Sequence, residues 1–78
     1  MNATRRRILE HLARATERVY GLDMVNAKIA SRFGLYVHMA WLEEQGFVEG
    51  QEERVTLRRS YKITDKGRAM LLPEARVR

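Results

Sequence analysis

Residues 31–46 read SRFGLYVHMAWLEEQG, and this stretch decides the fold of the 78-residue chain. Ser31 can cap a helix, because its hydroxyl can accept an unpaired backbone N–H of the first turn. Apolar residues then recur at helical spacing and form one stripe, made of Leu35, Met39 and Leu42. Gly46 can adopt the left-handed conformation that ends many helices. The stretch therefore predicts one helix over residues 31–45.

Two further helices are expected before this stretch. The first is capped by Asn2 or Thr4 and runs to about Thr16 or Arg18, with an inward face of Ile8, Leu12, Ala15 and Val19 beside Leu9. Tyr20-Gly21 breaks that pattern. A short second helix then spans Leu22 to Lys28, with Leu22, Val25 and Ile29 facing inward. Two helices joined by about three residues have the layout of a helix-turn-helix.

After Gly46 the apolar period changes from about 3.6 to 2, which indicates strands. One strand is expected from Phe47 to about Glu52, a turn over residues 53–56, and an antiparallel partner over residues 58–63. We call this expected hairpin, residues 47–63, the wing. In its second strand Arg59, Tyr61 and Ile63 alternate with Arg58, Ser60 and Lys62.

A last helix is expected from Asp65 to Leu72, capped by Thr64 and ended by Pro73. Ala69 and Leu72 are expected to face inward, and residues 74–78 to form a frayed tail. The element order is helix, helix, helix, strand, strand, helix. The sequence therefore predicts one α+β, mostly helical domain over residues 1–78, a winged helix-turn-helix with a two-stranded wing.

The net charge is +5 at pH 7, and the charges are unevenly distributed along the chain. Residues 43–53 carry five acids and no base, which leaves five acids against all 15 Lys and Arg elsewhere. This segregation indicates a basic face turned towards a polyanion and an acidic face turned away. A solvated surface with uneven charge is the alternative.

Two segments resemble PadR-type transcriptional regulators. Gly34–Glu49 is similar to their recognition-helix segment, with a Leu-Tyr pair, spaced apolar residues and Leu-Glu-Glu-Gln-Gly-Phe-Val. Arg58–Arg68 is similar to their wing and its exit, with an Arg-rich strand, Tyr61 and Thr-Asp-Lys-Gly. Tyr20-Gly21 also fits, so the resemblance covers about residues 5–72. MarR-like winged helices share the Gly-Phe/Leu-Val and Thr-x-Lys-Gly features. The resemblance implies a winged-helix DNA-binding transcriptional regulator.

Three features depart from the PadR pattern. Val37 stands where the family usually has Pro, and Ala40-Trp41 where it often has basic residues. PadR-type regulators dimerise through an added C-terminal helix, whereas few residues follow Leu72 here. We therefore expect a homodimer built from the first and last helices, with a candidate interface of Leu9, Met70 and Leu71.

The candidate DNA contacts are basic, hydroxyl or phenol side chains around the helix 31–45, the wing and the N-terminus: Arg5, Arg6, Lys28, Ser31, Arg32, Tyr36, Arg58, Arg59 and Lys62. Arg32 could read guanine bidentately or contact a phosphate. The wing arginines would contact the DNA backbone or minor groove. Arg5-Arg6-Arg7 would either lie on the backbone or form a solubilising end. The expected function is sequence-specific DNA binding by a repressor that keeps polymerase from a promoter.

Trp41 indicates an alternative function for the protein. Val37, His38 and Trp41 are expected on the side of the helix away from Leu35 and Leu42, so Trp41 is either exposed or folded back on the wing or the first helix. Large exposed aromatic residues mark interfaces. The alternative function is therefore a protein-interaction module that uses Trp41 and the acidic residues 43–53.

The sequence offers no enzyme chemistry. It has no Ser/His/Asp set, its five glycines are scattered, and no paired carboxylates lie in an apolar setting. With no cysteine and only His11 and His38, we expect no metal site and no cofactor. No apolar run approaches the roughly 20 residues of a membrane span. We expect a cytoplasmic protein of prokaryotic or viral origin that binds double-stranded DNA and no membrane.

Overall fold

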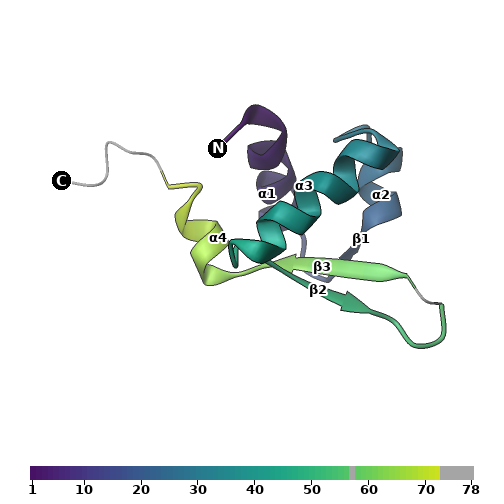
Figure 1. The fold of residues 1–78 in the computed structure, drawn as a ribbon. Helices are drawn as coiled ribbons and strands as arrows, with labels where there is room; N and C mark the ends of the chain where they lie inside the picture. Colours follow the sequence, from purple (N-terminus) through teal and green to yellow (C-terminus); the bar gives the residue numbers. More distant parts are fainter. Residues whose placement is uncertain (57, 73–78) are drawn as a thin grey trace.

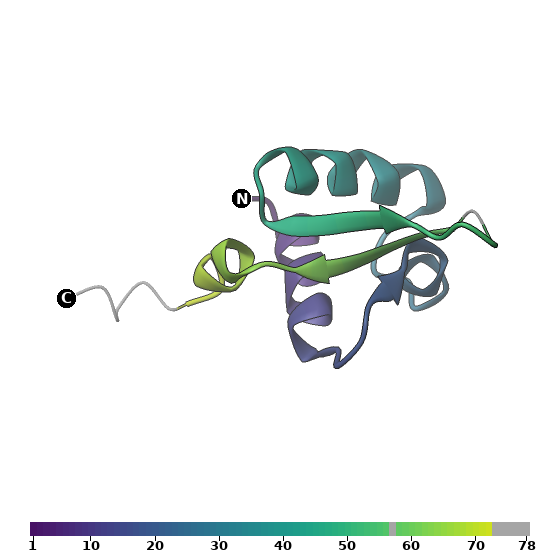
Figure 2. The same cartoon turned by 90° about the horizontal axis from the view of Figure 1, so that it is seen from below.

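The computed structural model describes residues 1–56 and 58–72. The elements are α1 (Ala3–Arg14), β1 (Val19–Tyr20), α2 (Gly21–Asn26), α3 (Arg32–Glu44), β2 (Val48–Glu52), β3 (Arg59–Ile63) and α4 (Asp65–Ala69). The helices α1, α2 and α3 lie together on one side of a small sheet, and α4 follows β3 at one end of the molecule (Figure 1). The β2–β3 hairpin projects at the other end (Figure 2).

The α3 helix confirms the prediction made for residues 31–45 to within one residue at its end. Ser31 caps it, since its hydroxyl accepts the Gly34 N–H at 3.0 Å. Gly46 follows with a φ of 80°, the left-handed conformation expected there. The buried residues of the helix are the three predicted ones, Leu35, Met39 and Leu42.

The sheet has three antiparallel strands in the order β1-β3-β2, where the sequence predicted only two. Val19 pairs with Tyr61 and Tyr20 with Ser60, so β3 is the central strand. The strict alternation predicted for this strand is wrong, because Ser60 and Tyr61 are both buried. Arg18 covers the outer face, where its Nε donates to Ser60 Oγ at 2.8 Å and its Nη2 to the Ser60 carbonyl at 3.0 Å.

The core lies between α1, α3 and the inner face of the sheet. It contains Ile8, Leu9, Leu12, Val19, Met24, Leu35, Met39, Leu42, Phe47, Val48, Tyr61 and Ile63. Leu9 is fully buried, so placing it at a dimer interface was wrong. The reason is that α1 contacts α3, α4 and β3, so it is covered on more than one side.

The first two helices are shorter than predicted. The α1 helix ends at Arg14, because Ala15 turns to an extended conformation with φ −79° and ψ 141°. Val19 therefore reaches the core from β1 rather than from a helix. The α2 helix starts at Gly21 and ends at Asn26, and Lys28 has a left-handed φ of 60°. Met24 is fully buried in place of Leu22, which is 38% exposed.

The last helix is also shorter than predicted. Thr64 caps it as expected, accepting the Gly67 N–H at 3.0 Å, but α4 ends at Ala69. Ala69 and Leu72 are exposed, so their inward assignment was wrong. Gly67 is the buried residue of α4 instead, and it packs directly against the Phe47 carbonyl. Pro73 and the tail 74–78 lie outside the described residues.

Within residues 1–56 and 58–72 no helix has the length and apolar character that a membrane span requires.

Candidate nucleic-acid interface

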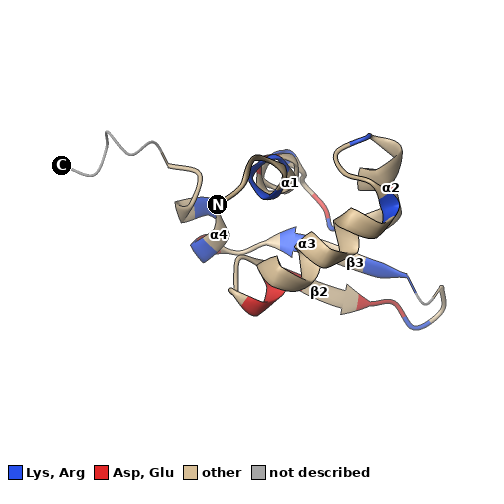
Figure 3. Ribbon diagram, turned by 45° about the horizontal axis from the view of Figure 1, so that its top comes forward, with Lys and Arg blue, Asp and Glu red and all other residues tan. Residues whose placement is uncertain are grey.

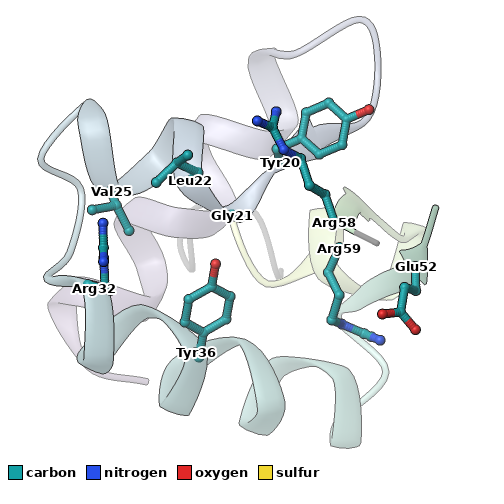
Figure 4. Close-up of a pocket in the computed structure, with 9 residues that line it drawn as sticks. All are labelled: Tyr20, Gly21, Leu22, Val25, Arg32, Tyr36, Glu52, Arg58 and Arg59. Atoms are coloured by element: carbon teal, nitrogen blue, oxygen red, sulfur yellow. The ribbon is translucent and has the colours of Figure 1, made fainter. Parts of the chain in front are cut away.

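An open groove of about 490 Å³ lies between α2, α3 and the β2–β3 hairpin (Figure 4). Its walls come from β1, α2, α3, β2 and β3 and from one loop position. The lining residues are Tyr20, Gly21, Leu22, Val25, Arg32, Tyr36, Glu52, Arg58 and Arg59. Three of these nine residues are arginines, and only one is acidic. The predicted contacts Arg32, Tyr36, Arg58 and Arg59 are therefore brought together in one place.

Tyr36 joins α3 to α2 at the floor of this groove. Its side chain points from α3 towards Gly21 (Figure 4). A Cβ atom at Gly21 would lie 3.0 Å from the Tyr36 hydroxyl, so the glycine allows the ring to pack closely against α2 in this position. Tyr36 is still 45% exposed, which leaves its hydroxyl edge accessible from the groove.

Arg58 and Arg59 form the wing side of the groove, and both contact aromatic rings. The Arg58 guanidinium carbon lies 5.6 Å from the Tyr20 ring centroid, and that of Arg59 lies 5.7 Å from the Tyr61 ring. Arg59 also bonds to Glu43 at 2.7 Å. This pair crosses directly over Gly50, where a Cβ atom would collide with both side chains. Arg59 is thus positioned by Glu43 of α3, whereas the Arg58 guanidinium lies over Tyr20.

Nearby groups shift the pKa values of the two tyrosines that the wing arginines cover. Glu53, chiefly as a hydrogen-bond acceptor, raises the pKa of Tyr20. Burial raises the pKa of Tyr61, and the Arg59 guanidinium offsets part of this rise. Both phenols therefore stay neutral at physiological pH and can donate hydrogen bonds.

On the opposite side of α3, Arg5 is engaged within the protein. Its Nε donates to His38 Nδ1 at 3.1 Å, and its guanidinium carbon lies 4.2 Å from the Trp41 ring centroid. Trp41 in turn packs edge-on against Phe47, with centroids 5.9 Å apart. Trp41 is half-buried between the first helix and the start of β2, the folded-back position considered from the sequence.

The other predicted DNA contacts differ in whether their side chains already have partners within the protein. Arg6 pairs with Glu10 at 3.5 Å and donates to the Met70 carbonyl at 3.4 Å, and Lys62 pairs with Glu49 at 3.4 Å. Lys28 and Ser31 are exposed in the α2–α3 turn, but the Ser31 hydroxyl is already used as a cap. Of the residues expected at an interface, Met70 is 40% exposed and Leu71 packs partly against the core.

The acidic residues 43–53 do not form one free surface. Figure 3 shows them at the end of α3 and at the end of β2, with basic residues on α1, β3 and α4. Glu43 pairs with Arg59, and Glu49 pairs with both Lys62 and Arg18. The segregation seen along the chain is thus partly neutralised in the fold.

The outward face of α3 carries an apolar surface that the sequence reasoning missed, although it placed Val37 on the side away from Leu35 and Leu42. Phe33 is 85% exposed and Val37 is 65% exposed, and Ala40 beyond them is exposed as well. The signal was present in the sequence, because Phe33 and Val37 are four residues apart and lie opposite the buried stripe. We call Phe33, Val37 and Ala40 the outer face of α3.

Solved structures match the arrangement of these elements. The adhesin competence repressor AdcR from Streptococcus pyogenes superposes with a TM-score of 0.77 over 90% of this chain, at 18% sequence identity. The fold is a winged helix. A proposed transcriptional regulator from Thermoplasma acidophilum also matches, with a TM-score of 0.65 over 87% of this chain at 22% identity.

The winged helix described here spans 50% of the length of AdcR and 70% of the Thermoplasma protein. Compared by sequence, the chain matches no protein-family model and no curated protein. The α3 helix is then the second helix of the helix-turn-helix, and the β2–β3 hairpin is its wing.

Proposed function

We propose that this winged helix binds double-stranded DNA sequence-specifically and regulates transcription, with α3 in the major groove. One observation carries the proposal: Arg32, Arg58 and Arg59, from α3 and the wing, line one open groove beside the outer face of α3. Basic groups beside an exposed helix match the phosphate backbone that borders a major groove. The two solved structures with this fold are described as a repressor and a proposed regulator.

Different elements would make different contacts with the DNA. Arg58 and Arg59 would hold the backbone or reach the minor groove from the wing, and Tyr36 would donate to a phosphate. Because Arg32 lies in the groove wall beside Val25 rather than on the outer face, we assign it to phosphate rather than to guanine (Figure 4). Lys28 and Ser31 would contact the backbone at the α2–α3 turn, with Arg6 from α1 and Lys62 from β3 contributing charge.

We further propose a homodimer that represses by excluding polymerase from a promoter. A single module of this kind buries roughly 600–1,000 Å² on DNA, and two-fold dimers gain specificity by reading two half-sites about one helical turn apart. The PadR-like character rests on the sequence resemblance, whereas the structural similarity supports the winged helix in general.

The experiment is selection of bound duplexes from a random DNA pool, followed by affinity measurements at several salt concentrations. We expect a selected sequence and a steep fall in affinity with salt, because each phosphate contact releases counterions. A failure to bind any duplex at low salt would reject the proposal. It would favour the protein-interaction function, which is weakened here because Trp41 is half-buried against Phe47 and Arg5.

A further inference from the structure

The outer face of α3 is an exposed apolar surface on the helix proposed to enter DNA. Phe33 and Val37 are 85% and 65% exposed, and their spacing puts them next to each other on successive turns. Ala40 extends the surface by one more turn. These side chains contribute nothing to the core, which α3 reaches through Leu35, Met39 and Leu42. A surface of this kind can contact an apolar partner.

The surroundings of this face are complementary in charge to DNA. Arg32, Arg58 and Arg59 lie in the groove along one flank of α3, and Arg5 lies against the other flank through His38 and Trp41. The acidic side chains of α3, Glu43 and Glu44, occupy its last two positions, away from Phe33. The N-terminal half of the helix, which in helix-turn-helix proteins contacts the bases, therefore combines an apolar centre with basic sides.

The outer face also lacks side chains that could read bases by hydrogen bonds. Phe33, Val37 and Ala40 carry no donor or acceptor. The neighbouring polar groups are used or directed elsewhere: the Ser31 hydroxyl caps the helix, Tyr36 points into the groove towards Gly21, and His38 Nδ1 accepts from Arg5. Within the described residues, direct readout from the centre of α3 must therefore use apolar contact.

Resting on the proposed DNA binding, we propose that the outer face of α3 reads thymine methyl groups, so that the protein selects A·T pairs in the major groove. The C5-methyl of thymine is the apolar group that the major-groove edges present, and Phe and Ala are suited to contact it. Both A·T and G·C pairs present polar groups in the major groove, so the thymine methyl is the group by which Phe33 and Val37 would favour an A·T pair.

The test compares the best duplex from the random pool with the same duplex made with deoxyuridine in place of thymidine. The two differ only in the methyl groups. We expect A·T pairs at the centre of each half-site. Removal of each contacted methyl should weaken binding about fourfold, because burial of one carbon stabilises by about 0.8 kcal/mol. The double variant Phe33→Ala, Val37→Ala should bind the two duplexes equally.

Val55→Ala is the matched control. Val55 is an apolar residue that is 94% exposed at the tip of the wing. The proposed complex places the wing at the DNA backbone or minor groove, whose edges present no thymine methyl. This variant should keep the preference of the parent for the thymidine duplex. Circular dichroism should show all variants folded, since each change is at an exposed position.

Two results would overturn the inference. Equal, salt-dependent binding of both duplexes by the parent would reject methyl readout and leave the proposed DNA binding intact. No duplex binding at any salt concentration would remove the proposed function itself, and would leave the outer face of α3 to a protein partner.

Discussion

At the scale of single residues, a basic side chain near α3 does not by itself identify a DNA contact. Arg5 and Arg59 were both predicted as contacts, but each has partners inside the protein. For Arg59 the partner Glu43 is on the surface, and both side chains remain partly exposed, so the pair can open towards a phosphate. For Arg5 the partners are an imidazole and an indole that also join α1 to α3.

We predict that Arg58→Ala combined with Arg59→Ala weakens binding to all DNA sequences about equally. The reason is that the wing arginines contact phosphate and sugar, which carry no sequence information directly. The slope of log affinity against log salt should fall by about 2, because each arginine neutralises about one phosphate. Affinities measured on selected and random duplexes check this. Unchanged binding at moderate salt would remove the wing from the interface.

We predict that Arg5→Ala lowers the free energy of unfolding by about 1 kcal/mol, because it removes the cation–π contact with Trp41 and the bond to His38. Urea unfolding followed by the fluorescence of Trp41, the sole tryptophan, measures the change. Arg7→Ala is the control, since Arg7 is exposed on the same helix, and it should stay within about 0.5 kcal/mol of the parent. Equal effects of the two substitutions would show that the Arg5 contacts contribute nothing.

At the scale of elements, short pieces of secondary structure depend on close backbone packing. The α4 helix has five residues and could not form alone. It is held by its Thr64 cap, by the Thr64 hydroxyl donating to the Gly46 carbonyl at 2.6 Å, and by the contact of Gly67 with Phe47. The Gly46–Phe47 turn and α4 therefore support each other.

We predict that Gly67→Ala destabilises the protein by about 1–3 kcal/mol, although alanine favours helices. The added methyl group would collide with the Phe47 carbonyl and press on the Ile63 side chain, and a backbone atom cannot move aside cheaply. Thermal unfolding by circular dichroism measures the effect. Ala69→Ser adds one atom at an exposed position of the same helix and should be nearly neutral. A stable Gly67→Ala protein would contradict the packing described for α4.

At the scale of the whole molecule, the open question is how two copies would meet. The start of α1 and the end of α4 are adjacent, since Arg6 donates to the Met70 carbonyl. Because Leu9 is buried, the exposed apolar surface near the end of α4 comes from Met70 and Leu72, which are 40% and 55% exposed. The homodimer proposed above would use this surface.

We predict that Met70→Glu converts a homodimer to a monomer, because it places a charge at the centre of the apolar contact. Sedimentation at micromolar concentration measures the mass of both proteins. The matched change Val55→Glu, at an exposed apolar residue of the wing tip, should leave the dimer intact. A parent protein with the mass of one chain, even with palindromic DNA present, would reject the homodimer.

Much of the fold followed from local signals in the sequence. The caps Ser31 and Thr64, the left-handed Gly46 and the apolar stripe of α3 were all predicted and found. Each depends only on residues within a turn or two, so the sequence alone contains the necessary information. The same holds for the change of period after Gly46, which located β2 and β3.

Only the tertiary structure decided which surfaces were available. The two residues of β1 have no periodicity to detect and become a strand because β3 lies beside them. Leu9 is buried and Arg5 is covered because α1 packs against α3, and the Arg5–His38 bond between these helices joins residues 33 positions apart. The sequence determined the kinds of the six expected elements and the bounds of α3, but not the ends of α1, α2 and α4. Long-range packing decided which arginines share a groove and which apolar side chains, Phe33 and Val37, remain outside the core.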